Sequence, residues 1–474
     1  MLSRFTKALL IGLTLLSSFS WAMADERPNI IIILCDDLGY GDLACYGNKV
    51  IRTPNIDKLA SEGIRFTSFY SSSPVCSPSR VGLMTGRTPN RAGVYDWIPG
   101  GNRMHMSKKE FTIPAMLKKT GYATCMSGKW HCNGIFNRKN QPQPGDFGFD
   151  HWFATQNNAA PSHKDPKNFV RNGKNVGLSK GFSCQIVAQE AVDWITKHVK
   201  NSPDQPFFSY VAFHEPHEPI DSPKHLIENY PKAKKKGEAL YYANVENMDS
   251  AVGQITLCLD RLNLTKNTLV IFSSDNGPET LNRYRSAWRS HGSPGPLRGM
   301  KLHTHEAGIR VAGIMRWPIQ IKDKQISDSP VSALDLLPTF ASLAAGEIPI
   351  NLKLDGADIV NAFGGSSVQR KKPLFWCYYS SLNKAKIAIR DGEWKLLASL
   401  KSADGKNIKA RSITEANRSL LQAAKLGDFE LYKISKDISE MNNLAEKHPK
   451  ELNVMAQKLQ SIYKDVVQDA KTWQ

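Results

Sequence analysis

The sequence predicts an α/β fold built on a doubly wound, mostly parallel sheet, followed by a smaller C-terminal α+β region. Apolar runs of strand length occur at 29–34, 207–213 and 268–274, and amphipathic stretches long enough for helices occur at 184–199 and 238–262. Apolar runs without polar alternation are typical of strands buried on both faces. Buried strands interspersed with amphipathic helices therefore predict a sheet covered by helices on both sides.

The pattern changes near residue 365. A Gly-Gly-Ser-Ser stretch and a basic segment are followed by short strand-like runs instead of long helical ones. We therefore expect an N-terminal domain of residues 25–365 and a smaller C-terminal region of residues 366–474. The expected elements of that region are strands at 374–379, 385–390, 394–397 and 429–433, and a long helix beginning at Pro449.

The first 24 residues predict a secretory signal peptide. Arg4 and Lys7 precede an apolar run at 8–16, and the small-residue end Ala22-Met23-Ala24 predicts cleavage before Asp25. The apolar run is too short for a good membrane span. We therefore expect an exported protein, periplasmic or extracellular, with no membrane span after cleavage.

The chain is strongly basic, with a formal charge of +18 from 62 Lys and Arg against 44 Asp and Glu. This charge falls by two when Arg4 and Lys7 leave with the signal peptide. A basic surface favours polyanionic partners, and a sulfated polysaccharide suits an exported protein. Nucleic acid is not expected as a partner, because export is predicted and no nucleic-acid-binding motif occurs. Nothing in the sequence indicates an oligomeric state.

One cysteine stands where a helix is expected to begin. Pro78 suits a first helical position and Gly86 can end a short helix, so Cys76 is expected at the positive end of a two-turn helix. Arg80, one turn later, carries a guanidinium that matches a tetrahedral oxyanion. The segment therefore predicts chemistry on sulfate or phosphate. If Cys76 is used in that way, seven of the eight cysteines remain, and their disulfide pairing cannot be deduced.

Oxygen-bearing side chains follow two of the predicted strands. Asp36 and Asp37 come after the run at 29–34, and Asp275 and Asn276 come directly after the run at 268–274. Ligands bind at the carboxyl ends of strands in open α/β sheets. A turn-capping role would explain one aspartate of the first pair but not both. Oxygen ligands alone favour Ca²⁺ or Mg²⁺ over Zn²⁺, and a set containing an amide suits calcium better.

Basic side chains gather at three further positions. Lys129 and His131 are two residues apart, so on an extended segment both point to one side while Trp130 packs behind. His214 and His217 follow the strand at 207–213; with prolines between them and no third soft ligand nearby, zinc is not expected. Lys301 ends a short basic segment that, by itself, would be read as a loop.

Together these clusters resemble the formylglycine-dependent (type I) sulfatases of the alkaline-phosphatase superfamily. Cys76-Ser77-Pro78-Ser79-Arg80 resembles the C-x-P-x-R signature, and Gly128-Lys129-Trp130-His131 resembles G-K-W-H. The stretch 430–444 resembles a structural signature of the same family. The resemblance implies an alkaline-phosphatase-like catalytic sulfatase domain, a C-terminal four-stranded antiparallel sheet with a terminal helix, and an exported carbohydrate sulfatase of the bacterial or arylsulfatase A-like kind.

The resemblance also implies the cofactors. A formylglycine-generating maturation enzyme would convert Cys76 to formylglycine (3-oxoalanine). One Ca²⁺ would be held by Asp36, Asp37, Asp275 and Asn276, with an oxygen of the modified Cys76 completing the shell. The implied catalytic residues are Cys76, Arg80, Lys129, His131, His217 and Lys301.

The family's mechanism then suggests roles. The hydrated aldehyde at position 76 would attack sulfur, His217 and Lys301 would assist the leaving alcohol, and Arg80 and Lys129 would hold the charge. His131 would take the proton that lets sulfate leave. His214 is the nearest competitor of His217 for its role. Cys132-Asn133 departs from the family pattern, which leaves the local pocket shape open.

Two other functions are compatible with these residues. The first is hydrolysis of phosphonates or phosphodiesters, which are also tetrahedral anions. The second is a polyanion-binding protein without catalysis. For substrate binding, the loops at 95–106 and 160–181 are expected to line the pocket, with Arg103 and His105 as the residues to test.

Overall fold

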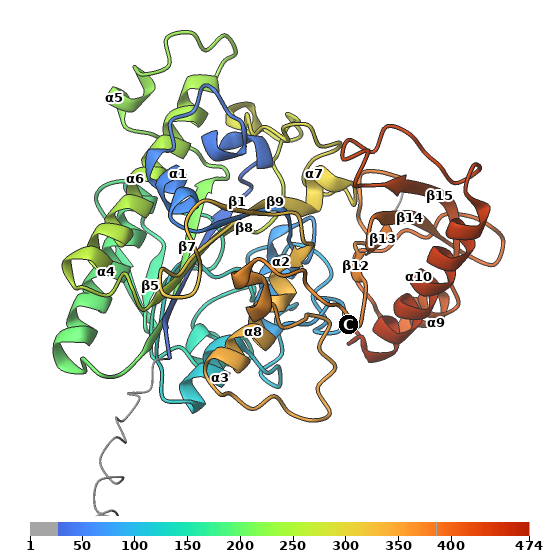
Figure 1. The fold of residues 1–474 in the computed structure, drawn as a ribbon, viewed down its shortest axis with the longest axis horizontal. Coiled ribbons are helices and arrows are strands. Elements are labelled where there is room, and N and C mark those ends of the chain that lie inside the picture. The colour runs from blue at the N-terminus through green and yellow to red at the C-terminus, as the bar shows by residue number, and fades with distance from the viewer. Residues whose placement is uncertain (1–26, 385, 474) are drawn as a thin grey trace, which may run out of the picture.

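The computed structural model describes residues 27–384 and 386–473 (Figure 1). Within them, strands form one large sheet of eleven strands and a second sheet of four. The order in the large sheet is β10-β2-β9-β8-β1-β7-β3-β4-β5-β6, with β11 beside β2. The five strands from β8 to β4 in this order are mutually parallel, and β9 and β5 flank them antiparallel. The predicted fold class is confirmed.

The three predicted central strands, at 29–34, 207–213 and 268–274, all form, and two further parallel strands, β3 and β4, lie in the same part of the sheet. Their bounds are β1 (Asn29–Asp36), β3 (Ala123–Lys129), β4 (His151–Thr155), β7 (Phe207–Pro216) and β8 (Thr268–Ser274). β8 has the predicted limits, whereas β1 and β7 run two and three residues further, because Asp36 still pairs with Pro216. The remaining strands of this sheet are β2 (Ile64–Tyr70), β5 (Phe169–Arg171), β6 (Lys174–Gly177), β9 (Arg310–Arg316), β10 (Gln325–Ser327) and β11 (Val331–Ser332).

Alternate residues of β1 enter two different cores. Ile30, Ile32 and Leu34 pack on the side of α2 (Cys76–Thr85), α3 (Ile113–Lys119) and α8 (Leu336–Leu343). Ile31, Ile33 and Cys35 pack on the side of α1 (Pro54–Ser61), α4 (Ser183–Asn201) and α6 (Glu238–Arg261). Figure 1 shows the two helix layers on opposite sides of the sheet. Burial on both faces explains the uninterrupted apolar run of this strand.

The C-terminal region forms the smaller sheet. Its antiparallel strands are β12 (Leu374–Cys377), β13 (Ile387–Asp391), β14 (Trp394–Lys401) and β15 (Lys425–Lys433), with α9 (Glu415–Gln422) and α10 (Pro449–Asp469) beside them. The Trp376 indole N–H donates to the Ser71 carbonyl oxygen at 2.8 Å, which joins this sheet to the end of β2. The C-terminal region therefore packs against the edge of the large sheet where the predicted site residues lie.

Two sequence expectations concern covalent and membrane features. All eight cysteines lie in the described residues and are free thiols. Within the described residues, no helix combines the length and apolar character needed to cross a membrane. The predicted signal peptide, residues 1–24, lies outside the part of the chain that the structure describes.

Candidate active site

The predicted metal-binding side chains meet at the carboxyl ends of β1 and β8. Asp36 is the last residue of β1, and Asp37 follows with a left-handed backbone (φ 63°). Asp275 and Asn276 follow β8 directly. The Asp37 backbone N–H donates to Asp275 Oδ1 at 3.3 Å, and Asn276 Nδ2 donates to Asp37 Oδ1 at 2.7 Å. The structure therefore brings all four residues into one contact group.

Cys76 lies in the first turn of α2. The helix begins at Cys76 after the extended residue Val75, so it starts two residues before the predicted Pro78. It ends where expected, because Gly86 adopts a left-handed backbone (φ 63°) that suits glycine and donates to the Gly82 carbonyl at 2.9 Å. All ten helical residues are buried, and Cys76 is 3% exposed. Burial raises the pKa of the Cys76 thiol to about 11, so an unmodified thiol is protonated at neutral pH.

Two cations surround the Asp36 side of the site. Lys129 forms a buried ion pair with Asp36 and donates to Asn158 Oδ1 at 3.1 Å. Arg80 binds Asp275 Oδ2 through Nε at 2.9 Å and Nη2 at 2.8 Å. Although burial opposes ionisation, Lys129 and the neighbouring cations hold the pKa of Asp36 well below its usual range. The surrounding cations therefore favour the ionised form of Asp36.

A glycine places Lys129 there. Gly128 has a left-handed backbone (φ 104°), and a Cβ at this position would lie 1.9 Å from the Ala212 carbonyl oxygen of β7. Glycine is required because any larger residue would push β3 and β7 apart at the point where both reach the site. Lys129 is the next residue and the last of β3, so its side chain leaves the sheet beside Asp36.

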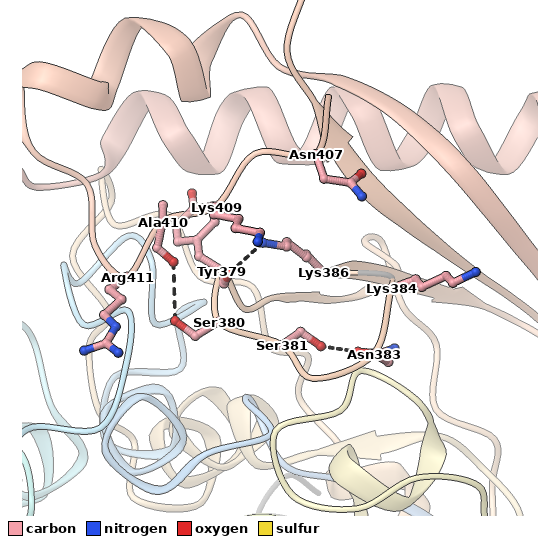
Figure 2. A pocket seen from close by; sticks show the side chains of 10 residues that line it. All are labelled: Tyr379, Ser380, Ser381, Asn383, Lys384, Lys386, Asn407, Lys409, Ala410 and Arg411. Carbon is pink, nitrogen blue, oxygen red and sulfur yellow. Dashed lines mark hydrogen bonds between the residues drawn. The ribbon is translucent and has the colours of Figure 1, made fainter. Parts of the chain in front are cut away.

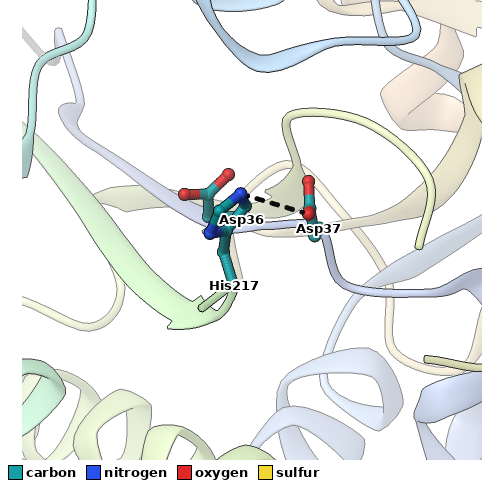
Figure 3. A group of neighbouring side chains, drawn as sticks. All are labelled: Asp36, Asp37 and His217. Atoms are coloured by element: carbon teal, nitrogen blue, oxygen red, sulfur yellow. Dashed lines mark ion pairs between the residues drawn. The ribbon is translucent and has the colours of Figure 1, made fainter. Parts of the chain in front are cut away.

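A different pair of basic groups surrounds Asp37. Lys301 Nζ donates to Asp37 Oδ2 at 2.7 Å, and His217 Nε2 lies 3.6 Å from the same oxygen (Figure 3). Burial, with a smaller effect of Lys301, lowers the pKa of His217 to about 4, whereas Asp37 outweighs burial and raises the pKa of Lys301. His214 is turned elsewhere, because its Nε2 is 2.7 Å from the Thr155 hydroxyl. The geometry thus favours His217 over His214 as a site residue.

His131 reaches the site by a route that the sequence did not predict. The expected extended segment 129–131 is wrong, because β3 ends at Lys129 and His131 has a left-handed backbone (φ 53°). Trp130 still packs inside, with its ring 5.6 Å from that of Phe147. Burial and then Lys129 lower the pKa of His131 well below its usual range. With Nε2 3.1 Å from the Ile98 carbonyl and no partner at Nδ1 among the described residues, the neutral ring can donate through Nε2 and accept at Nδ1.

A cavity of about 420 Å³ connects these groups. Its lining includes four of the predicted residues, Cys76, His131, His217 and Lys301. The other lining residues are Val75, Trp97, Asn157, Asn158, Arg283, Tyr284 and Leu302. Of these, only Trp97 lies in a loop that the sequence singled out, and a tryptophan in a predicted loop was a signal that could have identified it. The others lack any motif.

The proposed substrate residues Arg103 and His105 are not in this lining. His105 instead packs on Trp473, with ring centres 5.0 Å apart. The loop at 160–181 also contributes no lining residue. The unusual Cys132-Asn133 pair has no direct effect on the cavity, since both residues are buried outside the lining and Asn133 donates to the Pro142 carbonyl at 2.7 Å. Of the two loops expected to line the pocket, the one at 95–106 therefore contributes Trp97 but not Arg103 or His105, because composition does not reveal which side chains of a loop point inward.

The small C-terminal sheet also contributes to the site. Tyr378, directly after β12, packs against Val75 and Cys76. Its hydroxyl donates to Asp96 Oδ1 at 2.9 Å, next to the cavity residue Trp97. One wall beside Cys76 is therefore supplied by a residue some 300 positions later in the chain.

The acidic group fits a divalent cation. Asp36 Oδ1 and Asn276 Oδ1 are buried and have no hydrogen-bond partner among the described residues. Ligand atoms of Asp36, Asp37 and His217 lie within 4.8 Å of one another (Figure 3). Burial, followed by the charge of Asp36, raises the pKa of Asp275 to about 7. A hard cation would bind the unpaired oxygens and offset the crowding of carboxylates.

Comparisons with known proteins agree on one family. The family model for Sulfatase matches residues 28–347. N-acetylgalactosamine-6-sulfatase of Rattus norvegicus is 34% identical over 399 residues, covering 79% of this chain and 72% of the relative. N-acetylgalactosamine-6-O-sulfatase of Bacteroides thetaiotaomicron is 29% identical over 502 residues, covering 92% and 93%. The crystal structure of Ps i-CgsB in complex with k-i-k-neocarrahexaose superposes with a TM-score of 0.80 at 29% identity, covering 94% and 95% of the two chains.

Proposed function

The chain belongs to the sulfatase family and is a sulfuric ester hydrolase, and from this premise we propose that it removes sulfate from a sulfated carbohydrate with a formylglycine made from Cys76 and one calcium ion. The observation that carries the proposal is the position of Cys76. It lines the same cavity as His131, His217 and Lys301, at the start of a buried helix and beside an acidic group with unpaired oxygens.

Calcium would be held by oxygens of Asp36, Asp37, Asp275, Asn276 and the modified residue 76. When bound, it would polarise the oxygens that gather around it. The two unpaired oxygens, Asp36 Oδ1 and Asn276 Oδ1, support this assignment because both are acceptors only. An oxygen donor set without thiolate favours calcium over zinc.

Formylglycine would supply a hydrated aldehyde whose hydroxyl attacks sulfur. The chain contributes a cationic surrounding on the Asp36 side of the site, where Lys129 and Arg80 are fixed by buried contacts to carboxylates. Cations held in this way need no rearrangement when negative charge develops on the sulfate oxygens. Lys129 is restrained further by Asn158, which also lines the cavity.

Two groups on the Asp37 side can handle the leaving alcohol. Lys301 is protonated, since Asp37 raises its pKa, and it can give a proton to the departing oxygen. His217 has Nδ1 2.7 Å from the Glu218 carbonyl, so in the neutral ring Nδ1 carries the proton and Nε2 faces Asp37. Because Nε2 then has no proton to give, we assign proton donation to Lys301 and assign His217 to orienting the Lys301 ammonium beside Asp37, for which Nε2 is an acceptor. His131, neutral with a free Nδ1, is assigned to accepting the proton from residue 76.

The cavity wall supports a carbohydrate substrate. Trp97 is 46% exposed and Tyr284 is 37% exposed, and both line the cavity. Half-exposed aromatic rings offer flat apolar surfaces with polar edges, which suit the C–H faces of sugar rings. The N-acetylgalactosamine sulfatases and Ps i-CgsB, which resemble this chain, are themselves named for or solved with carbohydrates. The strongly basic composition favours sulfated chains over neutral ones.

Two further parts of the proposal concern export and maturation, which precede catalysis. We propose that residues 1–24 direct export to the periplasm or the extracellular space, and that a formylglycine-generating enzyme is a maturation partner. The charged start, the apolar run and the small-residue end of the first 24 residues support export.

The decisive experiment examines residue 76. Mass spectrometry of active protein should show the peptide containing residue 76 about 18 Da lighter than its cysteine form, because sulfur is replaced by oxygen with loss of two hydrogens. Cys76→Ala should abolish sulfate release from an aryl sulfate, while Cys258→Ala, a buried cysteine on α6, keeps it. Full activity of Cys76→Ala would overturn the mechanism. Faster turnover of an aryl phosphodiester than of the aryl sulfate would overturn the substrate class.

A further inference from the structure

A second hollow of about 560 Å³ lies beside the C-terminal sheet (Figure 2). Four of its lining residues, Lys384, Lys386, Lys409 and Arg411, are positively charged, and no lining residue is acidic. Figure 2 shows Lys384 and Arg411 at opposite ends of the lining with Lys386 between them. The remaining lining residues are Tyr379, Ser380, Ser381, Asn383, Asn407 and Ala410.

These four cations lack counter-ions. Among the described residues, none of them has a carboxylate within the 4.0 Å of an ion pair, and Lys386 donates instead to the backbone carbonyls of Tyr379 at 3.0 Å and Ile408 at 2.6 Å. Two nearby lysines behave differently, because the half-buried Lys401 pairs with Asp428 at 2.7 Å and the exposed Lys406 pairs with Asp404 at 2.8 Å. Like charges gathered in a hollow without partners repel one another, so a bound anion would stabilise them.

Two carboxylates outside the lining act on this group, and both already have other partners. Asp428 acts on Lys384 but pairs with Lys401 at 2.7 Å. Asp96 accepts hydrogen bonds from the Tyr378 hydroxyl at 2.9 Å and the Ser380 hydroxyl at 3.2 Å, and it influences Arg411 without an ion pair. Burial, and then Lys409, lower the pKa of Lys386, which agrees with a crowded positive environment. The hollow therefore keeps its positive charge uncompensated.

The hollow and the catalytic cavity share a thin wall. The Ser381 hydroxyl and the Leu382 backbone N–H both donate to the Leu302 carbonyl, at 3.1 and 3.0 Å. Leu302 lines the catalytic cavity and Ser381 lines the hollow. On another side, Ser380 of the hollow contacts Asp96, the neighbour of the cavity residue Trp97. The two spaces therefore adjoin where Ser381 and Leu382 contact Leu302.

We propose that this hollow, the anion groove, binds a second acidic group of the same glycan while the sulfate to be removed occupies the catalytic cavity. The inference rests on the proposed function and specifies its substrate class as an oligosaccharide with at least two acidic groups. The second group is a sulfate or a carboxylate, since lysine and arginine bind both.

Binding is measured first, without turnover. Titration calorimetry with Cys76→Ala protein uses three tetrasaccharides of one sugar backbone: one with two sulfates, one with a sulfate and a uronic acid carboxylate, and one with a single sulfate. Adding Lys384→Ala and Lys409→Ala should weaken binding of the doubly acidic probes about fivefold, because each exposed ionic contact contributes modestly. It should also reduce the salt dependence of their binding. The probe that loses more affinity identifies sulfate or carboxylate as the bound group.

The matched control replaces two exposed lysines of another loop, Lys232→Ala with Lys234→Ala. This pair removes the same net charge far from the groove, so it should leave the differences between the three probes as they are. Equal weakening of all three probes by the groove variant, or no weakening of the doubly acidic ones, would overturn the inference.

Turnover separates this inference from the proposed function. In protein that carries formylglycine at position 76, the groove variant should raise KM for the disulfated tetrasaccharide about fivefold with little change in kcat, since exposed ionic contacts act on binding. If the wild-type protein releases sulfate from no ester, the proposed function fails, but the calorimetric comparison still decides whether the groove binds acidic groups. If sulfate is released and the groove variant changes kcat alone, the inference fails and the proposed function stands.

Discussion

Two groups of buried charged residues in this protein have a similar composition. They differ in how closely the carboxylates of each group are paired with cations. The first, called here the open cluster, is the group at the ends of β1 and β8, made of Asp36, Asp37, Asp275, Asn276, Arg80, Lys129 and Lys301. The second, called the closed cluster, consists of Glu306, Glu440 and Lys395 with Arg310. Both are almost wholly removed from solvent.

The closed cluster satisfies its own charges. Lys395 lies 2.9 Å from Glu306 Oε1 and 2.8 Å from Glu440 Oε1. The second oxygen of Glu306 accepts from the Tyr70 hydroxyl at 2.7 Å, and the second oxygen of Glu440 accepts from the Glu306 backbone N–H at 2.6 Å. The cluster thereby ties β14 of the small sheet to α7 (Glu306–Ile309) and β2 of the large one.

The open cluster leaves acceptors unused. Asp36 Oδ1 and Asn276 Oδ1 have no hydrogen-bond partner among the described residues, and the group adjoins a cavity. Glu440 Oε1 of the closed cluster also makes no hydrogen bond there, but it lies 2.8 Å from the Lys395 ammonium, whereas Asp36 Oδ1 is 3.8 Å from Arg80 Nη2. Buried charge alone thus does not distinguish a functional site from a structural link. Unpaired acceptors beside a cavity do, and the two clusters should respond to mutation in opposite ways.

The largest effect is expected at Asp37. Asp37→Asn keeps the shape of the side chain but removes the charge that pairs with Lys301 and would bind calcium. Sulfate release should fall about a thousandfold, as expected for loss of a charge at the reacting centre. Calcium should raise the melting temperature of the wild-type protein but not of the variant, because only bound ligand stabilises the fold.

The same comparison can be made without mutation. A chelator should remove activity from the wild-type protein, and calcium should restore it better than zinc. Activity that persists after complete removal of divalent ions would contradict the calcium assignment.

A smaller loss is expected at His217. His217→Ala should slow hydrolysis of alkyl or sugar sulfates about a hundredfold, since a poor leaving oxygen needs help as it departs. An activated aryl sulfate, whose phenolate leaves readily, should be affected much less. Rates measured over a series of leaving groups test this, and an equal loss for every leaving group would exclude His217 from that step.

The closed cluster should affect stability and not chemistry. Lys395→Met leaves Glu440 without its cation and should lower the free energy of unfolding by about 3 kcal/mol, as for other broken buried pairs. The folded fraction should keep its kcat. Chemical denaturation and activity on the same samples measure both, with the exposed Lys406→Met as control. A loss of kcat without a loss of stability would reverse the assignment of the two clusters.

The smallest effect concerns acid. Burial opposes ionisation of Glu306, but Lys395 and Arg310 outweigh it and lower its pKa from 4.5 to about 2. Between these values the unfolded chain binds more protons than the folded one, so stability is complete above pH 4.5 and falls toward pH 2. In Glu306→Gln the melting temperature should fall less steeply across this window. An unchanged slope would show that Glu306 does not titrate as described.

The fold was predictable from the sequence where burial leaves a pattern. The β-branched run Thr268–Ser274 became β8 with the predicted limits. The hydrophobic pattern did not predict the ends of strands whose backbone pairing continues through polar residues. β7 runs on to Pro216 because Asp36 pairs with it, and β15 begins at Lys425, four residues early, because it pairs with the end of β14. Backbone hydrogen bonds do not depend on the type of side chain. They therefore produce no sequence pattern comparable to hydrophobic periodicity.

The site was predictable where residue types are grouped in motifs. Sequence reasoning could not find Asn158 beside Lys129 or Tyr378 beside Cys76, because each reaches the site only through tertiary packing. It placed Arg103 and His105 at the substrate by composition alone, and the structure turns His105 toward Trp473. Residues that share no motif and are brought together only by folding can be identified only from the structure.

The burial of Cys76 would set a time limit on its proposed maturation. A modifying enzyme cannot reach a residue that is 3% exposed in a helix packed between the sheet and Tyr378, so the proposed oxidation has to precede closure of this region. Tyr378 is made about 300 residues after Cys76, which at ordinary rates of synthesis is a delay of about 15 to 60 s. The long separation in sequence between a residue and the wall that covers it therefore gives the enzyme an interval in which to act. In a chain that folds before it is modified, Cys76 would become accessible to the enzyme again only after unfolding.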